Sequence, residues 1–133
     1  MPTARGSFDV TMRPDSDEDR AEGTTLGTMV VEKRFHGDLD GTGRGRMLTG
    51  MTPVEGSAGY VLIERVRGRL QDRRGSFLLQ HSGILDRGTP RQVIEVVPDS
   101  GTDDLTGLSG RLTIQISEGA HAYTLEYTLP RHP

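Results

Sequence analysis

The alternation of apolar and polar side chains with a period of two residues most constrains what this chain can fold into. It is clearest in residues 123–129, "YTLEYTL", where tyrosine and leucine alternate with threonine and glutamate. Such alternation is typical of a β-strand that buries one face. The chain's 18 glycines and 7 prolines divide it into short segments, and none of these segments shows a convincing helical period. The sequence therefore predicts an all-β protein.

Eight alternating segments are predicted as strands, at residues 4–13, 25–39, 43–54, 58–73, 75–86, 91–98, 108–117 and 121–129. The connectors are too short to hold a crossover helix, so neighbouring strands are expected to pair antiparallel in sequence order. One connector, residues 15–23, is rich in acidic side chains and is expected to be a solvated loop. We therefore expect residues 1–133 to form a single domain, an eight-stranded antiparallel meander barrel with residues 130–133 as a tail.

The composition excludes several classes of site and partner. The chain has no cysteine, which removes disulfides, thiolate nucleophiles and cysteine-based metal centres. A net charge of -3 and the lack of tryptophan argue against a basic groove with stacking platforms, so we expect no nucleic acid partner. No histidine spacing suggests a metal, and "GTGRG" lacks the spacing of a dinucleotide-binding loop. With no apolar span or leader, the expectation is a cytoplasmic protein with no membrane partner and no cofactor.

Strand parity identifies side chains that are expected inside the barrel. In residues 58–73, Tyr60 and Glu64 alternate with a face rich in arginine, and because that face must meet water, both should point inward. In residues 75–86, Phe77, Leu79 and His81 share one parity, which we favour as the inner one. The titratable His81 and Glu64 therefore lie on adjacent strands of the predicted interior.

The remaining strands are interpreted in the same way. Tyr123 and Tyr127 share the apolar parity of the last strand, so they are expected inside the barrel or in a subunit interface. The alternation of residues 108–117 places Ile116 in the core. In residues 25–39, Lys33 falls on the apolar face, whereas His36 lies among charged side chains and is expected to be solvated.

Several blocks of the sequence resemble a known family. They are "FHGDLDGTGRGRMLT", "EGSAGYVLIERVRGRL", "GSFLLQHSG", "VVPDSGTDDLTGLSG" and "YTLEYTL", and the match spans about residues 5–129. These blocks are similar to a bacterial family of small proteins described as a domain of unknown function, whose solved members resemble the calycin-like barrel of allene oxide cyclase. The resemblance implies the same eight-stranded barrel. Barrels of that shape include cofactor-free isomerases and cyclases that act on apolar, oxygenated molecules, but a shared fold does not fix a function.

The first functional hypothesis is that a small apolar or amphipathic molecule occupies the barrel. Glu64, His81 and Tyr60 would orient or protonate it in an isomerase or cyclase reaction. Burial raises the pKa of a carboxyl group and a neighbouring imidazolium lowers it, so such a pair can span the range needed for proton transfer. The ligand-lining residues expected from parity are Phe77, Leu79, Tyr123 and Tyr127.

The alternatives need no catalysis. Glu64 and His81 can form a structural hydrogen bond, or Glu64 can pair with an arginine at the barrel mouth, and a buried charged pair does not establish a role. The second functional hypothesis is accordingly a non-catalytic ligand-binding protein, or an interaction protein with a filled barrel. In either case we expect a homo-oligomer, with a dimer favoured.

Overall fold

The structure is a computed structural model in which residues 2–130 are described. Most of these residues lie in β-strands, as the alternation predicted, and a single 3₁₀ turn, η1 (Asp103–Leu105), lies among them. The predicted tail falls largely outside the described residues. The strands are β1 (Thr3–Pro14), β2 (Asp19–Ala21), β3 (Thr24–Gly37), β4 (Leu39–Met51), β5 (Ala58–Leu70), β6 (Arg73–Asp86), β7 (Thr89–Val96), β8 (Ser109–Ser117) and β9 (Ala120–Thr128).

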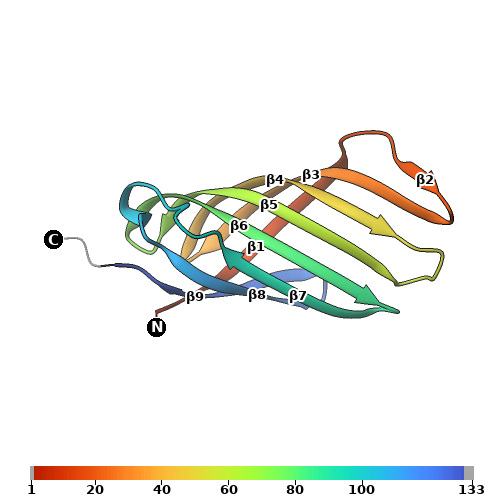
Figure 1. Cartoon of the computed structure of the whole chain (residues 1–133). Coiled ribbons are helices and arrows are strands. Elements are labelled where there is room, and N and C mark those ends of the chain that lie inside the picture. Colours follow the sequence, from red (N-terminus) through yellow and green to blue (C-terminus); the bar gives the residue numbers. More distant parts are fainter. Residues whose placement is uncertain (1, 131–133) are drawn as a thin grey trace.

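The strands close into a barrel (Figure 1). The hydrogen-bonded order of the strands is β1-β9-β8-β7-β6-β5-β4-β3, and β1 also pairs with β3, which closes the sheet. The short β2 pairs only with β3, so the other eight strands form the closed sheet. Every pairing is antiparallel. The predicted all-β, eight-stranded antiparallel barrel is therefore confirmed.

The two ends of the barrel differ. At the closed end, β1 begins, β9 ends, and residues 97–108 with η1 cover the interior, where Leu105 and Leu108 are each 1% exposed. The opposite end, which we call the mouth, carries the β1–β2–β3 hairpin and the turns after β4, β6 and β8 (Figure 1). The packed core fills the closed half; it includes Ala4, Phe35, Leu39, Val66, Leu70, Phe77, Leu79, Leu125 and Tyr127.

The turn between β3 and β4 lies earlier than predicted. The sequence pattern extended the second strand to residue 39, but β3 ends at Gly37, whose φ of 102° reverses the chain. A side chain at Gly37 would also lie 2.8 Å from the carbonyl oxygen of Arg5. Only glycine tolerates both conditions. The glycine that was interpreted as part of a strand therefore makes the turn.

Two other predictions were wrong in part. The acidic segment 15–23 is not entirely a loop, because β2 lies within it and returns along β3 through a turn at Glu22 and Gly23, both with positive φ. Ile116 has the inward parity predicted for it but is 68% exposed. The end of β8 extends past the packed layers, so parity alone does not bury this side chain.

Candidate functional site

At the mouth, the end of β1 and the segments of β3, β4 and β5 that lie there line a hollow of about 520 Å³. Three methionines, Met29, Met47 and Met51, line it together with Tyr60. The strand register places them side by side, since Met29 pairs with Met47 and Thr49 pairs with Tyr60. Residues 16–18, which connect β1 and β2, form part of its rim. The hollow is therefore mostly apolar, with flexible thioether side chains that adapt to different shapes.

Three polar side chains from β5, β6 and β7 form a hydrogen-bonded triangle beside this hollow. The Tyr60 hydroxyl lies 2.9 Å from His81 Nε2 and 3.2 Å from Gln92 Oε1. His81 Nε2 lies 3.0 Å from the same Gln92 oxygen. Gly83 has no side chain at the position that the Tyr60 ring covers, so the ring lies directly over its backbone. The bare backbone of Gly83 thus allows Tyr60 to reach His81.

The protonation state of His81 follows from its surroundings. Burial lowers the pKa of His81; the hydrogen bond with Gln92 opposes this effect, and the nearby positive charge of Lys33 adds to it. His81 Nδ1 is buried without a partner among the described residues. A neutral ring with its proton on Nε2 fits best, because Gln92 Oε1 can then accept from both Nε2–H and the Tyr60 hydroxyl. Burial also raises the pKa of Tyr60, which keeps this hydroxyl protonated.

Glu64 forms its ion pair with Lys33 of β3. Lys33 Nζ lies 3.0 Å from Glu64 Oε2, and the two side chains are 8% and 1% exposed. They meet across β4 at Gly43, where an added Cβ would lie 3.3 Å from Glu64 Oε1. Apart from this ion pair, neither carboxylate oxygen has a hydrogen-bond partner among the described residues. Gly43 therefore provides the space in which the buried charges meet.

Glu64 and His81 both point inward as predicted, but no hydrogen bond or ion pair joins them within residues 2–130. The structure also gives Glu64 a lysine partner inside the barrel, where the sequence suggested an arginine at the mouth. Proton transfer by Glu64 and His81 stays a prediction. The sequence analysis missed Gln92 entirely; for Lys33, the available signal was its position on an apolar face.

The four predicted ligand-lining residues lie deeper than the mouth hollow. Phe77, Leu79, Tyr123 and Tyr127 are at most 5% exposed and belong to the packed core. Other residues line the hollow. Contact between these four core residues and a ligand stays a prediction. Their observed role is in the packing of the fold.

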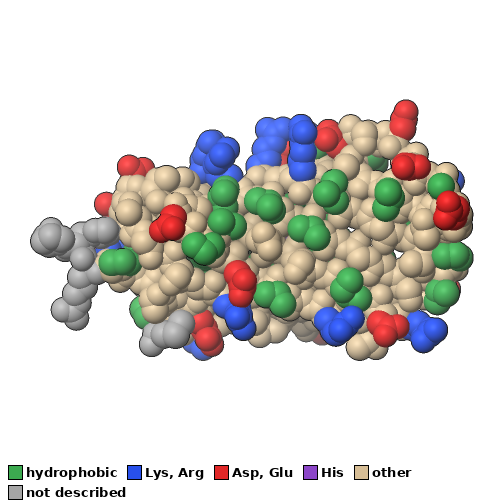
Figure 2. Space-filling view, viewed as in Figure 1, with side chains coloured by type: hydrophobic (Ala, Val, Ile, Leu, Met, Phe, Trp, Pro, Cys, Tyr) green, Lys and Arg blue, Asp and Glu red, His purple; other side chains and the backbone are tan. Residues whose placement is uncertain are grey.

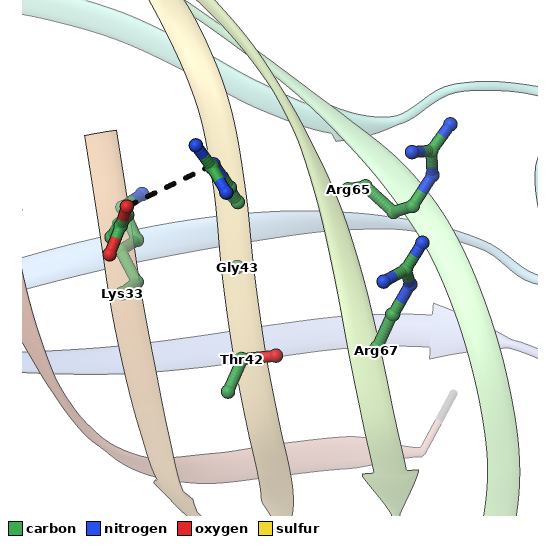
Figure 3. Close-up of a pocket in the computed structure, with 7 residues that line it drawn as sticks. Lys33, Thr42, Gly43, Arg65 and Arg67 are labelled. Atoms are coloured by element: carbon green, nitrogen blue, oxygen red, sulfur yellow. Dashed lines mark ion pairs between the residues drawn. The ribbon is translucent and has the colours of Figure 1, made fainter. Parts of the chain in front are cut away.

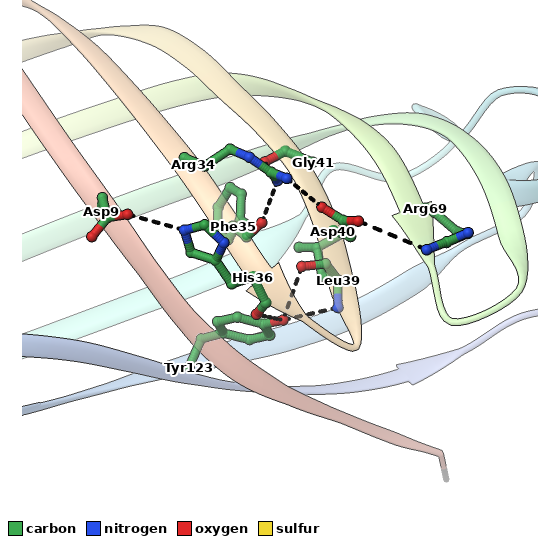
Figure 4. Close-up of polar contacts among 9 residues, drawn as sticks. All are labelled: Asp9, Arg34, Phe35, His36, Leu39, Asp40, Gly41, Arg69 and Tyr123. Atoms are coloured by element: carbon green, nitrogen blue, oxygen red, sulfur yellow. Dashed lines mark hydrogen bonds and ion pairs between the residues drawn. The ribbon is translucent and has the colours of Figure 1, made fainter.

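The two tyrosines hold the closed end together through their hydroxyls. Tyr123 accepts a hydrogen bond from the Leu39 N–H at 2.8 Å, and it donates to the His36 carbonyl oxygen at 2.9 Å (Figure 4). Tyr127 donates to Gln71 Oε1 at 2.9 Å. The predicted solvation of His36 is confirmed, because its side chain is exposed and lies 3.0 Å from Asp9 (Figure 4).

Residues 2–130 contain no cluster of three histidine or acidic side chains arranged to hold a metal ion. In the same part of the chain, no helix has the length and apolar character needed to cross a membrane.

Comparison with known proteins identifies the family. Residues 4–127 match the DUF3224 family, described as a protein of unknown function. A crystal structure of a protein with unknown function from this family, from Shewanella oneidensis MR-1, is 44% identical, covers 99% of both chains and has a TM-score of 0.94. No protein with a curated description matches. Similarity to allene oxide cyclase stays a prediction. Because the match covers nearly the whole chain in both sequence and structure, this protein belongs to the DUF3224 family.

Proposed function

We propose that the barrel binds a small, mainly apolar molecule with an oxygen-containing group in its mouth. The observation that supports this most directly is the methionine-lined hollow, which Tyr60 borders while its hydroxyl bonds to His81 and Gln92. A volume of about 520 Å³ lies within the usual range for small-molecule sites. An apolar wall with few oriented polar groups is also the common composition of such sites.

The ligand's apolar body would contact Met29, Met47 and Met51, and its oxygen would bond with the Tyr60 hydroxyl. In the tautomer assigned above, that hydroxyl donates to Gln92 and leaves an acceptor lone pair. It can instead turn its proton toward a ligand carbonyl, because Gln92 Oε1 keeps the His81 Nε2–H donor. The triangle thus serves ligands that carry a hydroxyl as well as those that carry a carbonyl.

A second candidate function is a cofactor-free isomerisation or cyclisation at the same place. The observation that favours it is the 2.9 Å contact between Tyr60 and His81, a phenol and a neutral imidazole whose pKa is lowered by burial. In such a reaction Tyr60 would donate its proton to a substrate oxygen, the His81 Nε2–H would donate a hydrogen bond to the resulting phenolate, and the phenolate would take a proton back from the intermediate as the product forms. The shape of the hollow would supply the rest of the rate enhancement by holding the reacting atoms of the substrate close together.

Titration with Nile red, a neutral apolar dye with a carbonyl group, tests the binding proposal. Wild-type protein should increase the dye's fluorescence in a saturable manner, and Met47→Arg, which places a charge at a half-buried position in the wall of the hollow, should weaken binding at least about tenfold. Ile116→Arg is the matched control, since Ile116 is exposed at the mouth but lies outside the hollow. Absence of saturable binding, or equal losses in the two variants, would refute binding in this hollow.

The polar end of the site needs a separate comparison. Tyr60→Phe removes only the hydroxyl, so it should weaken the binding of dyes that carry a carbonyl. It should leave the binding of a hydrocarbon probe such as diphenylhexatriene unchanged. If a substrate is found, unchanged turnover in both Tyr60→Phe and His81→Gln would exclude the catalytic alternative and leave the binding function standing.

A further inference from the structure

A band of exposed apolar side chains crosses the outer face of the barrel from β3 to β7. The strand register makes them neighbours, because Leu48 pairs with Val61, Val61 with Ser82, and Ser82 with Val93. The surface between them is hollowed into a groove of about 660 Å³. Separate apolar side chains are visible along this face in Figure 2. The band consists of Leu26, Leu48, Val61, Ile63, Ile84 and Val93, which are 43–61% exposed.

Toward the closed end, the same outer face becomes basic. Arg44 pairs with Arg65 in the ladder of β4 and β5, and Arg67 lies two residues further along β5. These three arginines border a hollow of about 320 Å³ (Figure 3). Arg44 has only a long contact with Glu32, at 3.9 Å, and Arg65 and Arg67 form no ion pair within the described chain. Glu32 lines the same hollow and partly compensates Arg44, so Arg65 and Arg67 carry most of the uncompensated positive charge of the cluster.

On the other side of the band, the mouth is acidic. The hairpin carries Asp17, Asp19 and Glu22, and the turn between β4 and β5 carries Glu55. None of these four forms an ion pair with another described residue. Acidic side chains are visible at the mouth in Figure 2, with basic ones lower down at the same end, and Arg91 lines the apolar groove. Around β4 and β5, the face thus runs from acidic, through apolar, to basic along the strand direction.

We propose that a second copy of this chain covers this face, so that the protein is a two-fold symmetric dimer. A two-fold axis lying in the interface and crossing the strands near Val61 reverses the strand direction in the partner. The two apolar bands then meet, and each acidic mouth lies over the other copy's arginines. An isologous interface must be self-complementary in this way.

The order of charges along β5 agrees with this arrangement. Arg67 follows Val61 by six residues, or about 20 Å in an extended strand, and Glu55 lies on the other side of Val61, in the turn that precedes β5. The two-fold rotation exchanges the two ends of the strand. The turn that carries Glu55 in one copy is thereby brought over the arginine end of the partner.

The acidic mouth favours a second copy over an anionic membrane or another polyanion. Either of those would be attracted by Arg65 and Arg67, but the acidic side chains on the same face and the net charge of -3 would repel it. Exposed apolar bands of this kind commonly mark protein interfaces. A copy of the same chain matches all three parts of the face at once.

Sedimentation equilibrium over a range of concentrations tests the proposal. The wild-type protein should be dimeric, and Val61→Lys should raise the dimer dissociation constant at least about a hundredfold, because it places a charge at the centre of the apolar contact. Thr113→Lys introduces the same exposed lysine on β8, outside the band, and should leave the dimer intact. Circular dichroism should show all three proteins folded, since both sites are already exposed.

Charge exchange tests the orientation of the two copies. Arg67→Glu should weaken dimerisation about tenfold or more, and adding Glu55→Arg to it should recover most of that loss. A monomeric wild type, a dimer unaffected by Val61→Lys, or a double variant weaker than Arg67→Glu would overturn the proposal. So would a wild-type monomer that binds vesicles containing phosphatidylglycerol through Arg67. Val61 does not line the mouth hollow, so Val61→Lys should abolish dimerisation without affecting dye binding, and a failure of one proposal can be told from a failure of the other.

Discussion

Removal of Lys33 is expected to destabilise the barrel strongly, because it leaves the Glu64 carboxylate buried without its cation. Lys33→Met keeps the length of the side chain and removes only the charge. Glu64 is 1% exposed, and its only charged partner among the described residues is the Lys33 ammonium at 3.0 Å. Breaking a buried pair from one side typically costs about 3–5 kcal/mol. A domain of this size has a total stability of about 5–15 kcal/mol, so this loss should be unmistakable.

The double variant Lys33→Met/Glu64→Met should recover most of the lost stability. It replaces both charges with apolar side chains of similar length, and such replacement of a buried pair is often neutral or stabilising by about 1–4 kcal/mol. The two single variants and the double variant form a cycle whose interaction energy should exceed about 3 kcal/mol. That large coupling is the signature of two charges that depend on each other in a dry environment.

Urea unfolding followed by far-UV circular dichroism measures each stability, since the chain has no tryptophan to serve as a fluorescent probe. The exposed pair Arg13–Glu32, at 3.1 Å, provides the matched control. Its cycle should give less than about 1 kcal/mol, because solvent screens exposed charges. If Lys33→Met costs no more than the exposed pair, or if the double variant loses the sum of the single losses, the reasoning about a dry ion pair is wrong.

Three further predictions follow from the packing and hydrogen bonding. Gly43→Ala should lower the free energy of unfolding in urea by about 1–3 kcal/mol, because the added Cβ would lie 3.1 Å from a Phe35 ring carbon. Gly59→Ala is the control: its added Cβ would have no neighbouring atom closer than 3.5 Å, so stability should change by less than about 0.5 kcal/mol. Tyr123→Phe should cost about 1–3 kcal/mol, since it leaves a buried backbone N–H without its acceptor, and a loss below 0.5 kcal/mol would contradict that assignment. Burial lowers the pKa of His81, so the unfolded chain binds a proton on this ring at a higher pH than the folded chain does. The contribution of neutral His81 to the free energy of unfolding should therefore be fully present above about pH 6.5. It should fall by at most about 1.4 kcal/mol per pH unit as the pH drops below that value. His81→Gln should remove this part of the pH dependence, and equal slopes in wild type and variant would contradict it.

Strand parity predicted the interior well because a β-strand has a side-chain period of two. Tyr60, Glu64 and His81 each point inward on the expected parity, and the arginine-bearing face of β5 faces out. The same rule cannot give depth. Ile116 has the correct parity for the core but lies beyond the packed layers at the mouth, where it is exposed.

The partners of the polar groups were not predictable from local sequence. Lys33 and Glu64 are on β3 and β5, so their contact depends on two strand registers and on the lack of a side chain at Gly43 between them. Gln92 reaches the Tyr60–His81 pair only because the β6–β7 register places it opposite Gly83. The displaced β3–β4 turn shows a third limit: glycine within an alternating segment can bend a strand or end it, and the choice depends on contacts from β1 and β9.

The distribution of polar groups along the barrel axis indicates why a ligand should stop at Tyr60. Below the mouth, the interior is occupied by Phe35, Val66 and Phe77, each at most 1% exposed, and by the Lys33–Glu64 pair, whose charges satisfy each other. A ligand that entered this region would have to displace packed aromatic rings or separate the ion pair, and either change costs several kcal/mol. The Tyr60 triangle is different, because its Gln92 member is exposed and its hydroxyl can exchange one acceptor for another at little cost. Changes at Tyr60 should therefore alter which molecules bind while barely changing stability, whereas changes at Lys33 should alter stability first.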